Sequence, residues 1–325
     1  MGELGERLRW MDQARGVAIL LVVMHHSMTW VADFGLTVPP ALSAFDDIVS
    51  PFRMPLLMFL SGILVPRALS KPTRAYAMGK LRAIGWPYLL WSVIFLVVTG
   101  TFTLSLVPNI LLFPPTYLWY LWFLLAYYAL AWLLARAGVP PLWPALVAML
   151  ASGFAPEDYR MSRFLFLLAF FLLGWAWSRR GPVRWSAPIR RLAIGAGLAA
   201  AVAVSAMSVA GVQVRYEPAY AWGVVGLIVA VATVLPGKAL GRAPMPVEYV
   251  GRNSIVFYVT HYTLIWMLDS LLIAAAGWRA AWAVWMIGVG AAMVVGTLFA
   301  MLRTRAPLVG WLFEWPASTR ASALR

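Results

Sequence analysis

The sequence predicts an all-α integral membrane protein, a bundle of about ten transmembrane helices with both termini on the cytoplasmic side. The first reason is composition: 62% of the 325 residues are hydrophobic, only 12% are charged, and the mean hydropathy is +0.80. Soluble domains carry about 25% charged residues, so this chain has too few charges to cover a water-facing surface. The second reason is a series of apolar segments near the length of roughly 20 residues that crosses a bilayer as a helix. The third is the distribution of Lys and Arg between the loops.

Ten candidate spans follow one another along residues 1–325, which are expected to form a single domain. They are Gln13–Phe34, Val49–Val65, Ile84–Leu106, Thr116–Ala135, Val139–Phe154, Phe164–Trp177, Leu192–Val214, Ala219–Leu235, Asn253–Ala275 and Ala280–Leu302. The first apolar run carries Arg15, His25 and His26, which is untypical of the plain core of a signal peptide. It is therefore expected to remain as a permanent span.

The positive charges agree with this topology. If the N-terminus lies inside, 21 of the 26 Lys and Arg fall in inner segments and 4 in outer ones, with Arg53 inside the second span. Lys and Arg of short loops stay on the cytoplasmic side, so the bias supports the orientation. It also accounts for the net charge of +14 without nucleic-acid binding. The four outer residues are Arg160, Arg163, Arg215 and Arg279.

Several classes of site are excluded by residue type and spacing. Cysteine is absent, which removes disulfides, thiolate metal sites and a cysteine nucleophile. The three His include the adjacent pair His25 and His26, and no metal-binding HExxH spacing or glycine-rich phosphate loop occurs. We expect neither a metal site nor a bound cofactor.

Ionisable residues in the first span give the sharpest candidates. Ionisable groups inside a membrane indicate function by default. Arg15 and His26 are eleven residues apart, almost three helical turns, so they share one face with a rise of roughly 16 Å. Asp12 falls near that face, whereas His25 points about 100° away. His26 then lies near the middle of the bilayer, either as a structural histidine bonded to a neighbouring helix or as a general base.

The second span and the loop after it offer candidate binding residues. Arg53 either reaches the outer headgroups or lines an outward cavity that binds a sugar or a carboxylate. Ser61, followed by glycine, fits a small-residue helix contact as well as a site residue. The next loop is basic without any acid, which charge bias alone explains, yet Lys and Arg are also what a phosphorylated donor needs. Its cations are Arg67, Lys71, Arg74, Lys80 and Arg82.

The ninth span carries a polar face. Asn253 and Ser254 fit a helix start, and Ser254, Tyr258 and His261 follow at spacings that share one face. These residues are either buried polar contacts between helices or a second wall of a site.

Taken in order, these segments resemble the acyltransferase 3 family over essentially the whole chain. Residues 10–16 (Trp-Met-Asp-Gln-Ala-Arg-Gly), running on to His25 and His26, resemble the family's first helix, whose mark is Arg, ten residues, then His. That spacing selects Arg15 and His26. Residues 52–55 (Phe-Arg-Met-Pro) and 59–62 (Phe-Leu-Ser-Gly) look like the second block in the fucose 4-O-acetylase-like branch. Weaker similarities are residues 80–82 with 87–88, residues 121–124, and residues 251–254 with His261.

The resemblance implies a ten-helix enzyme that moves an acyl group, usually acetyl from acetyl-CoA, onto a sugar or another hydroxyl acceptor of the cell envelope. It implies a multi-pass protein of the bacterial inner membrane, embedded in the lipid bilayer, with oligomers possible. Catalytic roles fall to His26, Arg15 and Asp12, with Asp12 holding Arg15. Donor binding falls to Arg67, Lys71, Lys80 and Arg82. Acceptor binding falls to Arg53, Ser61, Tyr258 and His261.

One rival function shares these features. A transporter or flippase of lipid-linked sugars would also place charges inside a bundle. Such proteins usually show inverted repeats and helices broken at matching positions, and the sequence shows no such pairing.

Overall fold

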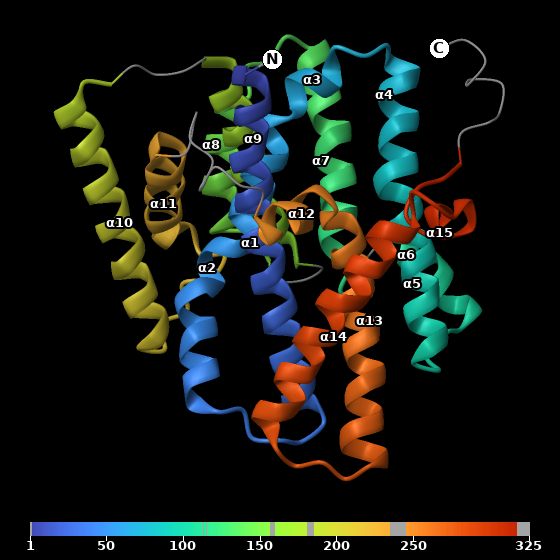
Figure 1. The fold of residues 1–325 in the computed structure, drawn as a ribbon. Coiled ribbons are helices and arrows are strands. Elements are labelled where there is room, and N and C mark those ends of the chain that lie inside the picture. Colours follow the sequence, from blue (N-terminus) through green and yellow to red (C-terminus); the bar gives the residue numbers. More distant parts are fainter. Residues whose placement is uncertain are drawn as a thin grey trace.

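A computed structural model describes residues 2–112, 114, 116–156, 160–180, 185–234 and 245–316. Within these ranges the chain forms helices and loops without any strand (Figure 1). The longer helices are α1 (Gly2–Asp33), α2 (Pro40–Ile63), α4 (Thr73–Lys80), α5 (Trp86–Val98), α7 (Trp119–Arg136), α8 (Leu142–Ser152), α9 (Met161–Arg180), α10 (Ala187–Val209), α11 (Ala221–Val234), α13 (Ser254–Asp269) and α14 (Ala281–Leu302). Shorter ones are α3 (Val65–Leu69), α6 (Val107–Leu112), α12 (Pro246–Arg252) and α15 (Pro307–Trp311).

Seven helical segments of the described chain are long and apolar enough to cross a membrane. They are Arg9–Asp33, Thr73–Val98, Trp119–Arg136, Met161–Arg180, Ala187–Val209, Ser254–Ala275 and Ala281–Leu302. The protein is therefore a multi-pass, all-helical membrane protein. The count of ten spans and the placement of the termini stay predictions.

The other three predicted spans are also helices, but they are short or charged. α2 has 24 residues and carries Asp46, Asp47 and Arg53. α8 has 11 residues and α11 has 14, which at 1.5 Å per residue is less than a hydrocarbon core of about 30 Å. Prolines before and within the first turn of α8 explain its late start, because proline has no N–H and fits only the first turn of a helix. Leu235, the predicted end of the eighth span, lies outside the described residues.

Several predicted boundaries differ from those of the structure, most clearly in the second and third spans. The second helix begins at Pro40 instead of Val49, since proline suits a first helical position and the carboxylate of Asp46 is paired inside the bundle. The third span begins at Thr73, eleven residues before Ile84, and ends at Val98. α4 runs into α5 through a π-helical turn (Leu81–Gly85), just ahead of Pro87. A π turn accommodates the missing N–H and the ring of a proline, so part of the expected basic loop is helical.

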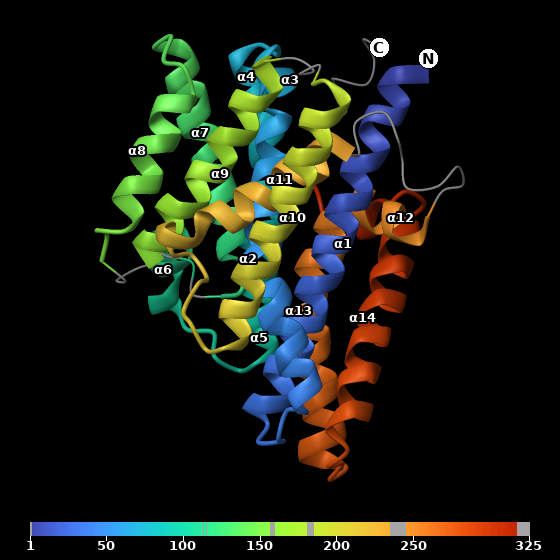
Figure 2. The ribbon, with the colours of Figure 1, turned by 90° about the vertical axis from the view of Figure 1, so that its left-hand side faces the viewer.

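The arrangement places α1 at the centre of the molecule (Figures 1 and 2). It packs against α2, α12, α13 and α14. α10 and α11 pack tightly on each other and against α2 at one edge of the bundle. Gly197 and Gly226 bring the backbones of that pair together, since a Cβ on Gly197 would lie 2.3 Å from the carbonyl oxygen of Gly226. The central position of α1 allows its polar residues to meet partners on several helices.

Candidate active site

His26 projects from α1 toward α13, where it meets His261. Nδ1 of His26 lies 2.8 Å from Nε2 of His261, and Nδ1 of His261 lies 3.0 Å from the carbonyl oxygen of Phe257. A carbonyl oxygen can only accept, so His261 donates from Nδ1 and carries its lone pair on Nε2. His26 must then donate from Nδ1, which leaves the lone pair on its own Nε2. The hydrogen-bond chain thus places His26 in the tautomer that a general base requires.

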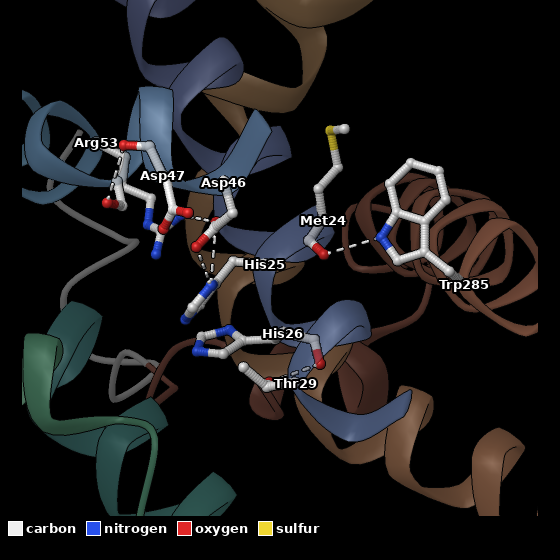
Figure 3. A network of polar contacts seen from close by, with 9 residues as sticks. Met24, His25, His26, Thr29, Asp46, Asp47, Arg53 and Trp285 are labelled. Atoms are coloured by element: carbon white, nitrogen blue, oxygen red, sulfur yellow. Dashed lines mark hydrogen bonds and ion pairs between the residues drawn. The ribbon is translucent and has the colours of Figure 1, made fainter. Parts of the chain in front are cut away.

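His25, the neighbour of His26, has partners of its own on α2. Its Nδ1 lies 3.0 Å from the carboxylate of Asp46, and Asp46 also accepts a short hydrogen bond from Arg53. Figure 3 shows Asp46 between His25 and Arg53, with His26 on the other side of His25. Neither His25 nor Asp46 was predicted from the sequence to belong to the site. The sequence of one helix does not reveal which other helix packs against the face that carries His25.

A cavity of about 170 Å³ opens between these residues. It is lined by Val22, His25, His26, Arg53, Met54, Trp119, Arg163, Arg215, Tyr216 and Tyr258. Tyr258 is held in place because its hydroxyl donates to the carbonyl oxygen of Tyr117 at 2.9 Å. Three of the predicted site residues, His26, Arg53 and Tyr258, therefore share one cavity, with His261 directly behind His26.

Arg163 and Arg215 also line this cavity, although the sequence indicated only that they are outer cations. Arg163 lies near the start of α9, with its guanidinium over the rings of Trp119 and Tyr216 at 5.2 and 4.6 Å. Arg215 lies in the loop that follows α10. One feature of the sequence could have pointed to them: both are positive charges in loops predicted to lie outside, where Lys and Arg are rare.

The N-terminal part of α1 is held by α12. Glu248 is 1% exposed and accepts hydrogen bonds from Arg9, Gln13 and Arg252. Asp12 pairs with Arg252 at 3.4 Å. In the part of the chain that the structure describes, no ion pair joins Asp12 to Arg15, although the charge of Arg15 also acts on Asp12. That Asp12 holds Arg15 stays a prediction. Residues one helical turn apart share a face, but Arg252 approaches the Asp12 carboxylate from another helix.

The contact of α1 with α12 depends on two glycines. A Cβ on Gly16 would lie 1.7 Å from the carbonyl oxygen of Val247, and a Cβ on Gly251 would lie 1.8 Å from that of Asp12. Such distances leave no room for any side chain. The glycine of the block at residues 251–254 therefore has a packing role, and the arginine that follows it has a pairing role.

Arg15 does not line the cavity and lies in the N-terminal half of α1. It is half-buried, and its charge acts on the hydroxyls of Tyr120 and Tyr128. Ser61 belongs to the same region. Its hydroxyl donates to the carbonyl oxygen of Leu57 at 2.8 Å, and it lies 3.4 Å from the hydroxyl of Tyr120. Tyr120 in turn packs against Tyr258, with ring centroids 5.3 Å apart. Polar side chains thus connect Arg15 with the cavity that holds His26.

The predicted donor residues do not share one surface. Arg67 is exposed, and the Lys80 ammonium lies over the Tyr128 ring at 3.3 Å from its centroid. Arg82 donates to the carbonyl oxygen of Trp315 at 2.8 Å. Lys71 lines a separate cavity of about 320 Å³ between α4 and α7.

That second cavity contains a cation which the sequence analysis did not select. Arg136, at the end of α7, donates to the hydroxyl of Thr73 at 2.9 Å and lies over the ring of Trp132. Together with Lys71 it gives the cavity two cations and an aromatic face. In the described ranges, no group of three His, Cys, Asp or Glu residues is placed to hold a metal ion.

The fold and the site define a multi-pass helical membrane protein with a polar, histidine-lined cavity inside its bundle. The chain belongs to the acyltransferase 3 family, whose acyltransferase-domain model matches residues 8–301. It is also similar to the inner membrane protein YcfT of Escherichia coli (strain K12), with 24% identity over 310 residues, covering 83% of this chain and 84% of that protein. No solved structure matches the chain. The family membership identifies the protein as a membrane acyltransferase.

Proposed function

We propose that this protein transfers an acyl group, acetyl in the first instance, from acyl-CoA to a hydroxyl group of a sugar or other cell-envelope acceptor in the bacterial inner membrane. His26 Nε2 takes the proton from the acceptor hydroxyl as its oxygen attacks the thioester carbon. The carbon–sulfur bond breaks, CoA leaves as the thiolate, and the thiolate is then protonated. In a variant of this scheme, His26 first accepts the acyl group itself and passes it on.

The observation that carries the proposal is the hydrogen-bond chain from Phe257 through His261 to His26. It leaves the Nε2 lone pair of His26 available beside the cavity. When His26 becomes protonated, its Nδ1–H still donates to His261, so the ring keeps its orientation through the proton transfer. His261 is therefore a positioning residue in this scheme.

A second cavity, at the other end of the molecule, supports binding of the acyl-CoA donor. Lys71 and Arg136 line the cavity near the cytoplasmic end of α7, and cations with a planar guanidinium suit phosphate groups. Arg15, Tyr120 and Ser61 lie between that end of the molecule and His26. We propose that CoA phosphates bind near Lys71 and that Arg15 orients the pantetheine arm or the thioester. Arg67, Lys80 and Arg82 would then guide the donor electrostatically.

The acceptor side is the cavity beside His26. Arg53 is 4% exposed and fixed by Asp46, so it presents a rigid charge-assisted donor. Tyr258 and Trp119 supply aromatic walls. A hydroxyl compound held between Arg53 and Tyr258 places its oxygen next to His26.

The test is an acyl-transfer assay on protein purified into nanodiscs. Labelled acetyl-CoA and a cell-envelope extract are added to the wild type and to His26→Ala, and both thiol release and label transfer are measured. General base catalysis is worth about 10²–10⁴-fold, so His26→Ala is expected to lose at least a hundred-fold in transfer. The matched control is Thr29→Ala, one turn along the same helix, whose hydroxyl bonds only to a backbone carbonyl. Near-normal transfer by a folded His26→Ala protein would end the proposal.

A further inference from the structure

Two of the four arginines predicted to lie in outer segments line the cavity, and a third lies near them. Arg163 and Arg215 line it, and Arg160, in the segment before α9, is close enough to Arg163 for that charge to lower the pKa of Arg160. The cytoplasmic preference of Lys and Arg explains why cations are rare in outer segments. It gives no reason for collecting three of them at one point.

These guanidinium groups are held without the partners that buried cations need. Nη1 of Arg160 and Nε of Arg163 are buried and have no hydrogen-bond partner among the residues that the structure describes. Burial, together with the nearby charge of Arg163, lowers the pKa of Arg160. A buried donor without an acceptor is unfavourable, so each of these groups marks a place where an acceptor is missing.

Among the described residues, the carboxylates nearby do not fill that role. Asp46 is already bound to His25 and Arg53. The charge of Arg215 acts on Asp47, but no ion pair in the described part of the chain joins Asp47 or Glu217 to Arg160, Arg163 or Arg215. Glu157 and Asp158 lie outside the described residues. Over the residues that the structure describes, the cavity therefore carries an excess of positive charge.

The segments that contain Arg160 and Tyr216 each have one residue with a positive φ angle. Arg160 has φ 60° and Tyr216 has φ 65°, the only positive values among non-glycine residues of the described chain. Bulky residues rarely adopt this conformation, and such outliers gather at functional sites. Here one of them, Tyr216, lines the cavity beside Arg215, and the other, Arg160, lies just before the helix that carries Arg163.

We propose that Arg163 and Arg215, supported by Arg160, bind an anionic group of the acceptor, so that the hydroxyl compound acylated here carries a carboxylate or a phosphate. This inference rests on the proposed function and specifies its substrate class. Arginine binds both anions through paired N–H donors. Because His25, His26 and Arg163 line the same cavity of about 170 Å³, an anion held there keeps a hydroxyl of the same molecule close to His26.

The first experiment measures the acceptor directly. A cell-envelope extract is separated on an anion-exchange resin, and transfer of labelled acetyl into the bound and unbound fractions is compared. The label is expected in the bound fraction. Arg163→Gln and Arg215→Gln are each expected to raise the apparent KM for that fraction about ten-fold or more, the size of one charge-assisted hydrogen bond, and to leave the KM for acetyl-CoA unchanged.

Arg279→Gln is the matched control, since Arg279 is an exposed outer arginine that does not line the cavity. Its KM for the acceptor should equal that of the wild type. Phosphatase treatment and methyl esterification of the bound fraction distinguish the two sources of charge: the treatment that removes the recognised anion abolishes labelling. Equal labelling of the neutral fraction, with no KM change in the Arg163 and Arg215 variants, overturns the inference but leaves the acyltransferase intact.

A binding measurement separates this inference from the proposed function. Thermal unfolding is followed with added glucuronate, inorganic phosphate or neutral glucose, and no turnover is needed. One of the two anions is expected to raise the melting temperature of the wild type and Arg279→Gln, and to have little effect on Arg163→Gln or Arg215→Gln. An equal response of all four proteins to both anions overturns the site. Failure of the wild type to release thiol from acyl-CoA contradicts the proposed function instead.

Discussion

Two groups of charged residues surround α1, and they differ in how their charges balance. The inner cluster, near the start of α1, comprises Arg9, Asp12, Glu248 and Arg252, two cations and two anions joined by ion pairs. The outer cluster, around the cavity, comprises Asp46 with Arg53, Arg160, Arg163 and Arg215. Among the described residues of the outer cluster, only Arg53 is paired with a carboxylate, that of Asp46, and the other three arginines have no ion pair.

The difference separates a structural use of buried charge from a functional one. The inner cluster is completed by the protein itself, and it clamps α12 onto α1 where Gly16 and Gly251 allow backbone contact. Breaking it should therefore affect stability. In the proposal above, an anionic group of the acceptor completes the outer cluster, so changing this cluster should affect transfer more than folding.

The largest effect on stability is expected for Glu248→Gln. Glutamine cannot balance Arg9 and Arg252, and removing one partner of a buried ion pair typically costs about 3–5 kcal/mol. Unfolding of the purified protein in nanodiscs should show a clear drop in melting temperature. Transfer activity measured well below that temperature should stay near wild type. A large loss of activity in a fully folded variant would assign the inner cluster a role in chemistry.

Asp46→Asn tests the outer cluster in the corresponding way. The amide oxygen still accepts a hydrogen bond from His25 or Arg53, but the negative charge between them is lost. We expect transfer to fall about ten- to a hundred-fold, as for the loss of one charge-assisted hydrogen bond. The melting temperature should fall less than in Glu248→Gln. The reverse order of the two melting temperatures would contradict the comparison.

Gly16→Ala tests whether the inner cluster depends on close helix contact. The new methyl group would meet the carbonyl of Val247, and overpacking of this kind typically costs about 1–3 kcal/mol. Gly290→Ala, in α14, is the matched control because no atom lies within 4 Å of its added Cβ. That variant should unfold at the wild-type temperature or slightly above it. Equal effects of both substitutions on the melting temperature would show that helix propensity, and not contact between helices, determines the change in stability.

The smallest effect is expected for Glu314→Gln. This residue pairs with Arg82 at 3.6 Å, but its side chain is 61% exposed. Exposed ion pairs contribute about 0–1 kcal/mol, so the melting temperature should barely change. A loss as large as that of Glu248→Gln would mean that burial does not distinguish the ion pairs of this protein.

Helix identity could be predicted well because it depends on local pattern. Seven of the ten predicted spans lie on helices long enough to cross a membrane, and the block at residues 251–254 does begin a span at Ser254. Boundaries were predicted less well where composition and structure diverge. The basic stretch before Ile84 reads as a loop by charge, yet Thr73–Val98 is continuous helix because the π turn accommodates Pro87.

The sequence by itself determined that this is a helical membrane acyltransferase with Arg15 and His26 on one face of its first span. Helical periodicity and hydropathy act over a few turns, so neighbours in the chain are enough to establish them. Only the tertiary structure decided that His26 meets His261, that His25 meets Asp46, and that Arg163 and Arg215 reach the same cavity. Those partners come from segments far apart in the sequence, and which helices pack together determines which side chains meet.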